Sequence, residues 1–149
     1  MKVLIENHQK LIKINLRKLK RDSRALLTAF RLNKTELGVL LVSDGQMIRL
    51  NRLHRTLNKP TDVLSFPIYE HKGEIPGSRE SLLGDIVINL EAAKRQSGLY
   101  GLTFYDEVRR LLIHGFLHLL GYDHEKNPYQ QKKMKRHESE LRNALEALD

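Results

Sequence analysis

The chain has 149 residues, of which 40% are apolar and 30% are charged, a balance typical of one globular domain and not of a disordered chain. It contains no cysteine, which excludes disulfide frameworks, thiolate zinc sites, iron–sulfur clusters and cysteine nucleophiles. Lys and Arg outnumber Asp and Glu by 26 to 18, and the net charge of +8 predicts a polyanionic partner, most commonly a nucleic acid and alternatively an anionic membrane surface.

Hydrophobic periodicity predicts short strands and helices in turn along the chain. In chain order, the expected elements are a strand at 3–5, a helix at 16–30, a strand at 37–42, a helix at 47–54, strands at 61–66 and 82–89, and helices at 91–97, 103–120 and 128–148. We therefore expect an α+β fold, with a small mixed sheet of about four strands packed with about five helices in a single domain over residues 1–149. The polar residues 68–81 are expected to form a long loop, which is uncommon unless the loop has a function.

Several residues mark the ends of these elements. Asn15 is a typical N-cap for the first helix, and Ser43 with Gln46 forms a capping-box pattern before the second. Gly98 is expected to stop the helix before it, and Gly121 to end the longer helix that follows.

No part of the sequence predicts a membrane segment. The chain has no apolar run of roughly eighteen residues, the length that a spanning helix requires. Its first residues hold too short an apolar stretch for a secretory signal. We therefore expect a cytoplasmic protein without a membrane partner.

Three of the seven histidines lie within eleven residues, at His114, His118 and His124. The first two are four residues apart on a predicted helix, so their Cβ atoms lie roughly 5–6 Å apart on one face, as in the zincin-type HxxxH helix. Imidazole nitrogens at this separation can bind one metal ion, and the turn at Gly121 allows His124 to return as a third ligand. Three histidines with an open fourth position are typical of a catalytic zinc site, so we expect one Zn²⁺ per chain.

Other interpretations of this segment stay open. The helix is apolar nearly all round, so its histidines could be buried and paired with protein groups instead of a metal. Imidazole ligands also suit nickel, copper or iron. A zinc metallopeptidase would need a general base, but the position that holds glutamate in the peptidase motif H-E-x-x-H is Gly115 here, which weakens that alternative.

Three blocks are specific enough to compare with a known family: KPTDVLSFP at 59–67, LGDIVI at 83–88 and HGFLHLLGYDH at 114–124. In this order they resemble signature segments of the YbeY family of bacterial endoribonucleases, and the likeness extends over about residues 35–125. The resemblance implies a metal-dependent endoribonuclease that is specific for single-stranded RNA. It also implies a role in ribosomal RNA maturation and ribosome quality control, with RNA and the ribosome as partners.

The resemblance implies functional residues as well. The family's zinc ligands correspond to His114, His118 and His124, and an arginine thought important for cleavage corresponds to Arg55. The neighbours of Arg55 depart from the family's Y-R-G-K-D pattern, because a histidine precedes it and Thr, Leu and Asn follow. Arg55 could therefore clamp a phosphate with two hydrogen bonds, or be a solvated arginine at a helix end.

Further polar residues have two interpretations each. Asp85 could orient a ligand histidine, or cap the backbone after Gly84. Basic residues on the first and last helices could line an RNA path or form solvated faces; they are Arg17, Lys18, Lys20, Arg21, Lys132, Lys133, Lys135 and Arg136. A non-catalytic ribosome-binding factor with a structural metal stays a third functional alternative.

Overall fold

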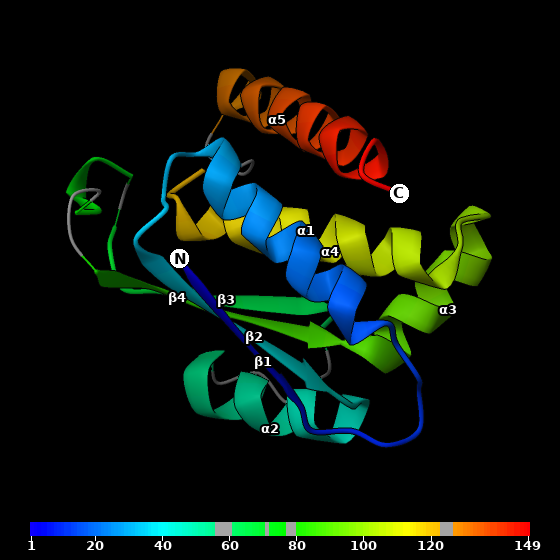
Figure 1. Cartoon of the computed structure of the whole chain (residues 1–149). Helices are drawn as coiled ribbons and strands as arrows, with labels where there is room; N and C mark the ends of the chain where they lie inside the picture. The colour runs from blue at the N-terminus through cyan, green and yellow to red at the C-terminus, as the bar shows by residue number, and fades with distance from the viewer. Residues whose placement is uncertain (56–60, 71, 77–79, 123–126) are drawn as a thin grey trace.

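The computed structural model describes residues 1–55, 61–70, 72–76, 80–122 and 127–149. Its elements in chain order are β1 (Lys2–Asn7), α1 (Leu16–Ala29), β2 (Thr35–Val42), α2 (Asp44–Arg55), β3 (Val63–Pro67), the 3-10 turn η1 (Lys72–Glu74), β4 (Ser81–Asn89), α3 (Leu90–Tyr100), α4 (Phe104–Leu119) and α5 (Pro128–Glu146). In Figure 1, α1, α4 and α5 lie on one side of a single sheet and α2 lies on the other. The predicted α+β class with a small mixed sheet is confirmed.

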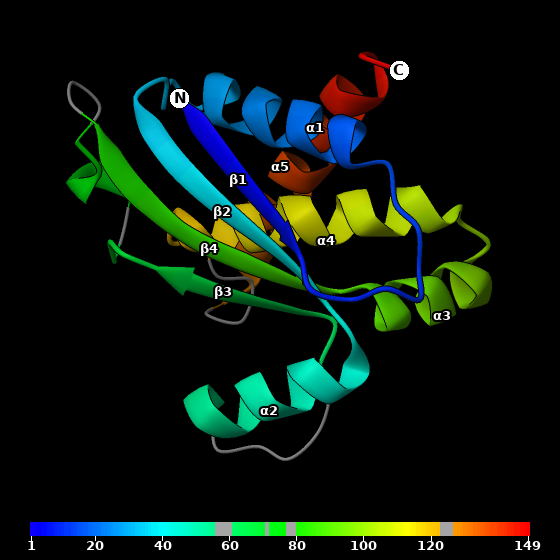
Figure 2. The same ribbon diagram turned by 60° about the horizontal axis from the view of Figure 1, so that its bottom comes forward.

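The sheet has the strand order β1-β2-β4-β3. The pairs β1–β2 and β2–β4 are parallel, whereas β3 runs antiparallel to β4 at the edge. The central strands β2 and β4 are rich in apolar residues. In β2, Thr35, Leu37, Val39 and Leu41 are buried, and the residues between them are partly exposed on the other face. The edge position of β3, which the proline at its end predicts, is confirmed and brings β3 beside α4 (Figure 2).

Most of the expected helix ends are confirmed. The Asn15 side chain accepts a hydrogen bond of 3.1 Å from the backbone N–H of Lys18. Ser43 and Gln46 form the expected capping box, in which each side chain accepts from the other residue's backbone N–H, at 3.4 and 2.9 Å. Gly121 has a φ of 95°, so it takes the left-handed conformation that follows a helix end.

The end of α3 differs from the prediction. The helix continues through Gly98 to Tyr100, and the left-handed cap is Gly101, with a φ of 67°. The backbone N–H of Gly101 donates to the carbonyl of Ser97. Two glycines three residues apart offer the same local signal, and the prediction chose the wrong one.

The expected loop at 68–81 is shorter than predicted. Its middle contains η1, and its last residue, Ser81, already belongs to β4. The backbone N–H of Lys72 donates to the carbonyl of Leu120 at 3.1 Å, which ties this segment to the end of α4. Whether the segment has a function stays a prediction.

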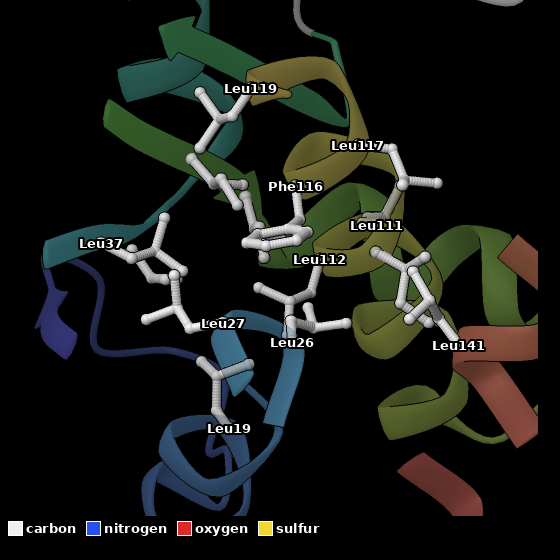
Figure 3. Packing of buried hydrophobic residues seen from close by; sticks show 14 of the residues in the cluster. Leu19, Leu26, Leu27, Leu37, Leu111, Leu112, Phe116, Leu117, Leu119 and Leu141 are labelled. Atoms are coloured by element: carbon white, nitrogen blue, oxygen red, sulfur yellow. The ribbon is translucent and has the colours of Figure 1, made fainter. Parts of the chain in front are cut away.

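The main core lies between the sheet and the layer of α1 and α4 (Figure 3). Leu26 and Leu27 of α1 meet Leu112 and Phe116 of α4 there, all at most 1% exposed. On its other side α4 contacts α5, so α4 lies between the sheet and α5. Among the described helices, none combines the length and apolarity needed to pass through a bilayer.

A network of ion pairs joins α1, the first half of α4 and the residue Asp149 that follows α5. The guanidinium of Arg109, 1% exposed, donates to Asp22, which is fully buried, at 3.0 Å and to Asp149 at 2.9 Å. Arg21 also donates to Asp149, at 2.6 Å, and the Tyr105 hydroxyl donates to Asp22 at 2.6 Å. The network therefore fastens the residues after α5 to α1 and α4.

Candidate metal centre

α4 is buried along most of its length but is partly open along one stripe. Between residues 107 and 120, the positions that keep partial exposure are Arg110, His114 and His118. They recur at every fourth residue, so they follow one another along a single face of the helix. The structure therefore confirms the shared face that the spacing of the two histidines predicts.

The imidazole rings of His114 and His118 point their Nε2 atoms at each other. The two nitrogens are 3.1 Å apart, and the ring centroids are 4.6 Å apart. Two metal–imidazole bonds of about 2.0–2.1 Å at a tetrahedral angle would separate their nitrogens by about 3.3 Å. The pair therefore fits two neighbouring positions around one metal ion.

A third side chain, from another helix, contacts one of these two rings. Oε1 of Glu138, on α5, lies 3.1 Å from Nδ1 of His114. The sequence prediction did not include Glu138, although a signal was present. Met134, Leu141 and Leu145 are the buried residues of α5, and position 138 falls on the same face by helical spacing. A carboxylate within an apolar stripe indicates a partner in the fold.

Gly115 allows α4 to lie close to the sheet. A Cβ atom at this position would lie 2.7 Å from Cγ2 of Ile86 and 3.3 Å from Oγ of Ser65. The Ser65 hydroxyl donates to the carbonyl of Gly115 at 3.0 Å, which fixes the approach. The position after His114 therefore faces the sheet at backbone distance and has no room for the glutamate of a peptidase motif.

The structure does not describe the side chains of two predicted site residues, His124 and Arg55. His124 lies outside the described residues, so its assignment as a third ligand stays a prediction. Arg55 is the last residue of α2, on the far side of the sheet from α4 (Figure 2), and its side chain lies outside the described part of the chain. Among the described residues, no three His, Cys, Asp or Glu side chains form a group that could hold a metal ion.

Asp85 does not orient His114 or His118, the two ligand candidates that the structure describes. Its neighbour Ile86 faces α4 beneath Gly115, and successive strand residues alternate, so Asp85 faces the opposite side of the sheet. Burial, followed by the charges of Glu6 and Glu36, raises the pKa of Asp85. The three carboxylates line a pocket of about 540 Å³ on the face that α2 covers in part. The orienting role toward these two histidines is therefore wrong. The apolar pattern of β4 does not show which face Asp85 takes, so the sequence alone could not decide between the two interpretations.

The two predicted basic runs differ in the structure. Lys18 and Arg21 of α1 are paired with Asp149, at 3.5 and 2.6 Å. On α5, by contrast, cations gather around His137. Burial, and then the charges of Lys133, Arg136 and Lys72, lower the pKa of His137, against an opposite effect of Glu140.

The cations around His137 also lie near aromatic rings. The ammonium group of Lys133 is 5.7 Å from the ring centre of Tyr122, and that of Lys72 is 5.1 Å from the ring centre of Phe30. We call Lys72, Lys133 and Arg136 the α5 cation cluster. Lys133 and Arg136 lie on α5, the helix that also carries Glu138.

Comparison with known proteins adds a further line of evidence. The sequence model of the family described as Endoribonuclease YbeY matches residues 4–146. A protein named Endoribonuclease YbeY from Aquifex aeolicus is 39% identical over 87% of this chain and 87% of its own length. The protein of the same name from a Sulfurihydrogenibium species is 44% identical over 78% of this chain and 74% of its own. The solution structure of a Thermotoga maritima protein, 25% identical, aligns with 96% of this chain and 88% of its own at a TM-score of 0.67.

Proposed function

Because the chain belongs to the YbeY family of endoribonucleases, we propose that it is a metal-dependent endoribonuclease that cleaves single-stranded RNA. The observation that carries this proposal is the convergence of the His114 and His118 Nε2 atoms, 3.1 Å apart, on the open stripe of α4. We further propose that the protein acts in the cytoplasm, in ribosomal RNA maturation and ribosome quality control, with the ribosome as partner. The whole chain would serve as one domain.

The proposed metal is zinc, one ion per chain, with His114 and His118 as two ligands and His124 as the third. When bound with an open position, zinc supplies Lewis-acid chemistry that lowers the pKa of water to near 7 and polarises a phosphate oxygen. The chain's own contribution is rigidity. The buried residues of α4 and the contact between Ser65 and Gly115 hold both rings in one orientation.

Charge supports RNA as the substrate. The net charge is +8, and the α5 cation cluster places two of these charges on α5, the helix whose Glu138 contacts His114. Cations of this kind bind phosphates without reading the base sequence, so affinity should fall steeply with salt. We propose that Arg55 adds a further phosphate contact and stabilises negative charge that develops during cleavage.

The metallopeptidase alternative has less support. A peptidase of the H-E-x-x-H type uses the glutamate after the first histidine as its base. Here that position is Gly115, and a Cβ atom added there would lie 2.7 Å from Cγ2 of Ile86. A peptidase would need its base from another element.

The test is cleavage of an end-labelled single-stranded RNA by zinc-loaded protein, with His118→Ala as the inactive variant. His8→Ala is the matched control, because His8 is an exposed histidine paired with Glu6. We expect cleavage by the wild type and by His8→Ala, and none by His118→Ala.

Three other outcomes decide against this function. Full cleavage by His118→Ala would exclude the metal-centred mechanism. No cleavage, with RNA affinity retained and a lower melting temperature after metal removal, would favour the ribosome-binding factor with a structural metal. Chelator-sensitive digestion of an unfolded protein substrate would favour the peptidase.

A further inference from the structure

We propose that Glu138 is a positioning residue of this centre: its carboxylate fixes the tautomer and the orientation of the His114 ring, so that Nε2 is free to bind metal. The inference rests on the metal centre of the proposed function. It adds a residue from a different helix, one that lies outside the three signature blocks of the sequence.

The geometry defines one tautomer. A carboxylate only accepts hydrogen bonds, so the 3.1 Å contact between Glu138 Oε1 and His114 Nδ1 requires a proton on Nδ1. In a neutral imidazole, Nε2 then carries the lone pair. That same Nε2 faces the Nε2 of His118 at 3.1 Å, which is where a shared ion would bind. The contact with Glu138 thus selects the form of His114 that a metal needs.

The position of Glu138 on α5 is unusual for a charged residue. It lies four residues after Met134 and three before Leu141, which are 1% and 8% exposed. The side chain of Glu138 is itself only 29% exposed. Placing a carboxylate on an apolar stripe costs free energy unless it gains a partner. The hydrogen bond to His114 supplies such a partner, and the charge of Arg110 on α4 acts on the same carboxylate.

α5 is capped at its start, and the residues after its end are bonded to α1 and α4, which supports a fixed position for Glu138. At the start, the Asn127 side chain accepts from the backbone N–H of Gln130 at 2.8 Å. After the end, Asp149 is held by Arg109 and Arg21. With α5 packed along α4 (Figure 1), the carboxylate reaches His114 directly from the neighbouring helix.

Zinc affinity tests this role without depending on RNA cleavage. The variants are Glu138→Ala, which removes the acceptor, and Glu138→Gln, which keeps an acceptor oxygen but no charge. Glu140→Ala is the matched control, because it removes an exposed carboxylate from the same helix. Zinc affinity is measured by competition with a chromophoric chelator, the His114 tautomer by ¹⁵N NMR of the metal-free protein, and the fold by thermal unfolding.

We expect Glu138→Ala to weaken zinc binding by about 10–100-fold, Glu138→Gln to weaken it less, and Glu140→Ala to leave it unchanged. The NMR spectra should show the Nδ1–H tautomer of His114 in the wild type and a mixture of tautomers in Glu138→Ala. If Glu138→Ala does not fold, the comparison of Glu138→Gln with Glu140→Ala gives the answer.

Two results would overturn the inference. One is a Glu138→Ala protein that is folded and binds zinc as tightly as Glu140→Ala. The other is an Nε2–H tautomer of His114 in the wild type. A wild type that binds no zinc would instead exclude the proposed metal centre, and this inference with it.

Discussion

Two polar clusters on α4 show how similar residues serve different ends. Around Arg109, the central pair is buried, with Asp22 and Arg109 0% and 1% exposed, and the partly exposed Arg21 and Asp149 bond to it. Around His114, the side chains are partly exposed and two nitrogens converge on one point. A buried cluster whose members satisfy one another holds the fold together. A partly open cluster whose lone pairs converge is suited to binding a ligand.

The largest expected effect comes from breaking the buried cluster. Asp22→Ala leaves the Arg109 guanidinium without its buried partner, and breaking such a pair costs about 3–5 kcal/mol. Urea unfolding of the metal-free protein measures the loss, with Glu140→Ala as an exposed control. A loss below about 1 kcal/mol would show that Arg109 finds a substitute and that the two clusters do not differ as described.

Metal removal should affect the open cluster in a different way. With free zinc at 100 times its dissociation constant, binding to the folded state alone adds about 2.7 kcal/mol of stability. Chelation should therefore lower the melting temperature of the wild type and leave that of metal-free His118→Ala unchanged. An equal decrease in both proteins would place the bound metal elsewhere.

Gly115→Ala should have a smaller effect that involves both packing and site. The new methyl group would approach Cγ2 of Ile86, a branched side chain in a tight core, and overpacking of this kind costs about 1–3 kcal/mol. Because α4 must move away from the sheet, zinc affinity should fall together with stability. Gly45→Ala is the control, since a Cβ there meets no atom within 4 Å. Unchanged urea unfolding in Gly115→Ala would show that the approach of α4 is not tight.

The smallest effect is expected at Asp149 and only in acid. Hydrogen bonds from Arg109, and then from Arg21, hold the pKa of Asp149 below its ordinary value. Its contribution to stability is therefore present in full above the unfolded-state pKa of about 3.9, decreases as the pH falls below that value, and is lost when the pH falls through the lower pKa of the folded state. Asp149→Asn should lower stability more at pH 6 than at pH 2. Urea midpoints at both pH values check this, and an equal loss at pH 2 and pH 6 would contradict it.

The sequence predicted best the features with local causes. The caps at Asn15 and Ser43, and the shared face of His114 and His118, depend on residues within one helical turn of each other. The fold class also followed, because short apolar runs and helical periodicity are local patterns.

Features that depend on distant residues were missed or misassigned. Glu138 lies 24 residues from His114 along the chain, and only the packing of α5 on α4 brings them together. Asp85 lies within an apolar strand on the face that α2 covers only in part, and the position of the helices decides which face this is. The roles of His124 and Arg55 stay predictions.

The open stripe of α4 also matters for changing the chemistry of this protein. Most of α4 is committed to the core, so a substitution at a buried position alters packing first. Positions 114 and 118 keep partial exposure, so their side chains can be exchanged with less disturbance of the core, whereas Arg110 on the same stripe is bonded to the buried Glu107. Replacing a histidine here by aspartate would vary the ligand type on a fixed scaffold, and ligand type is one of the properties that decide which metal a site prefers.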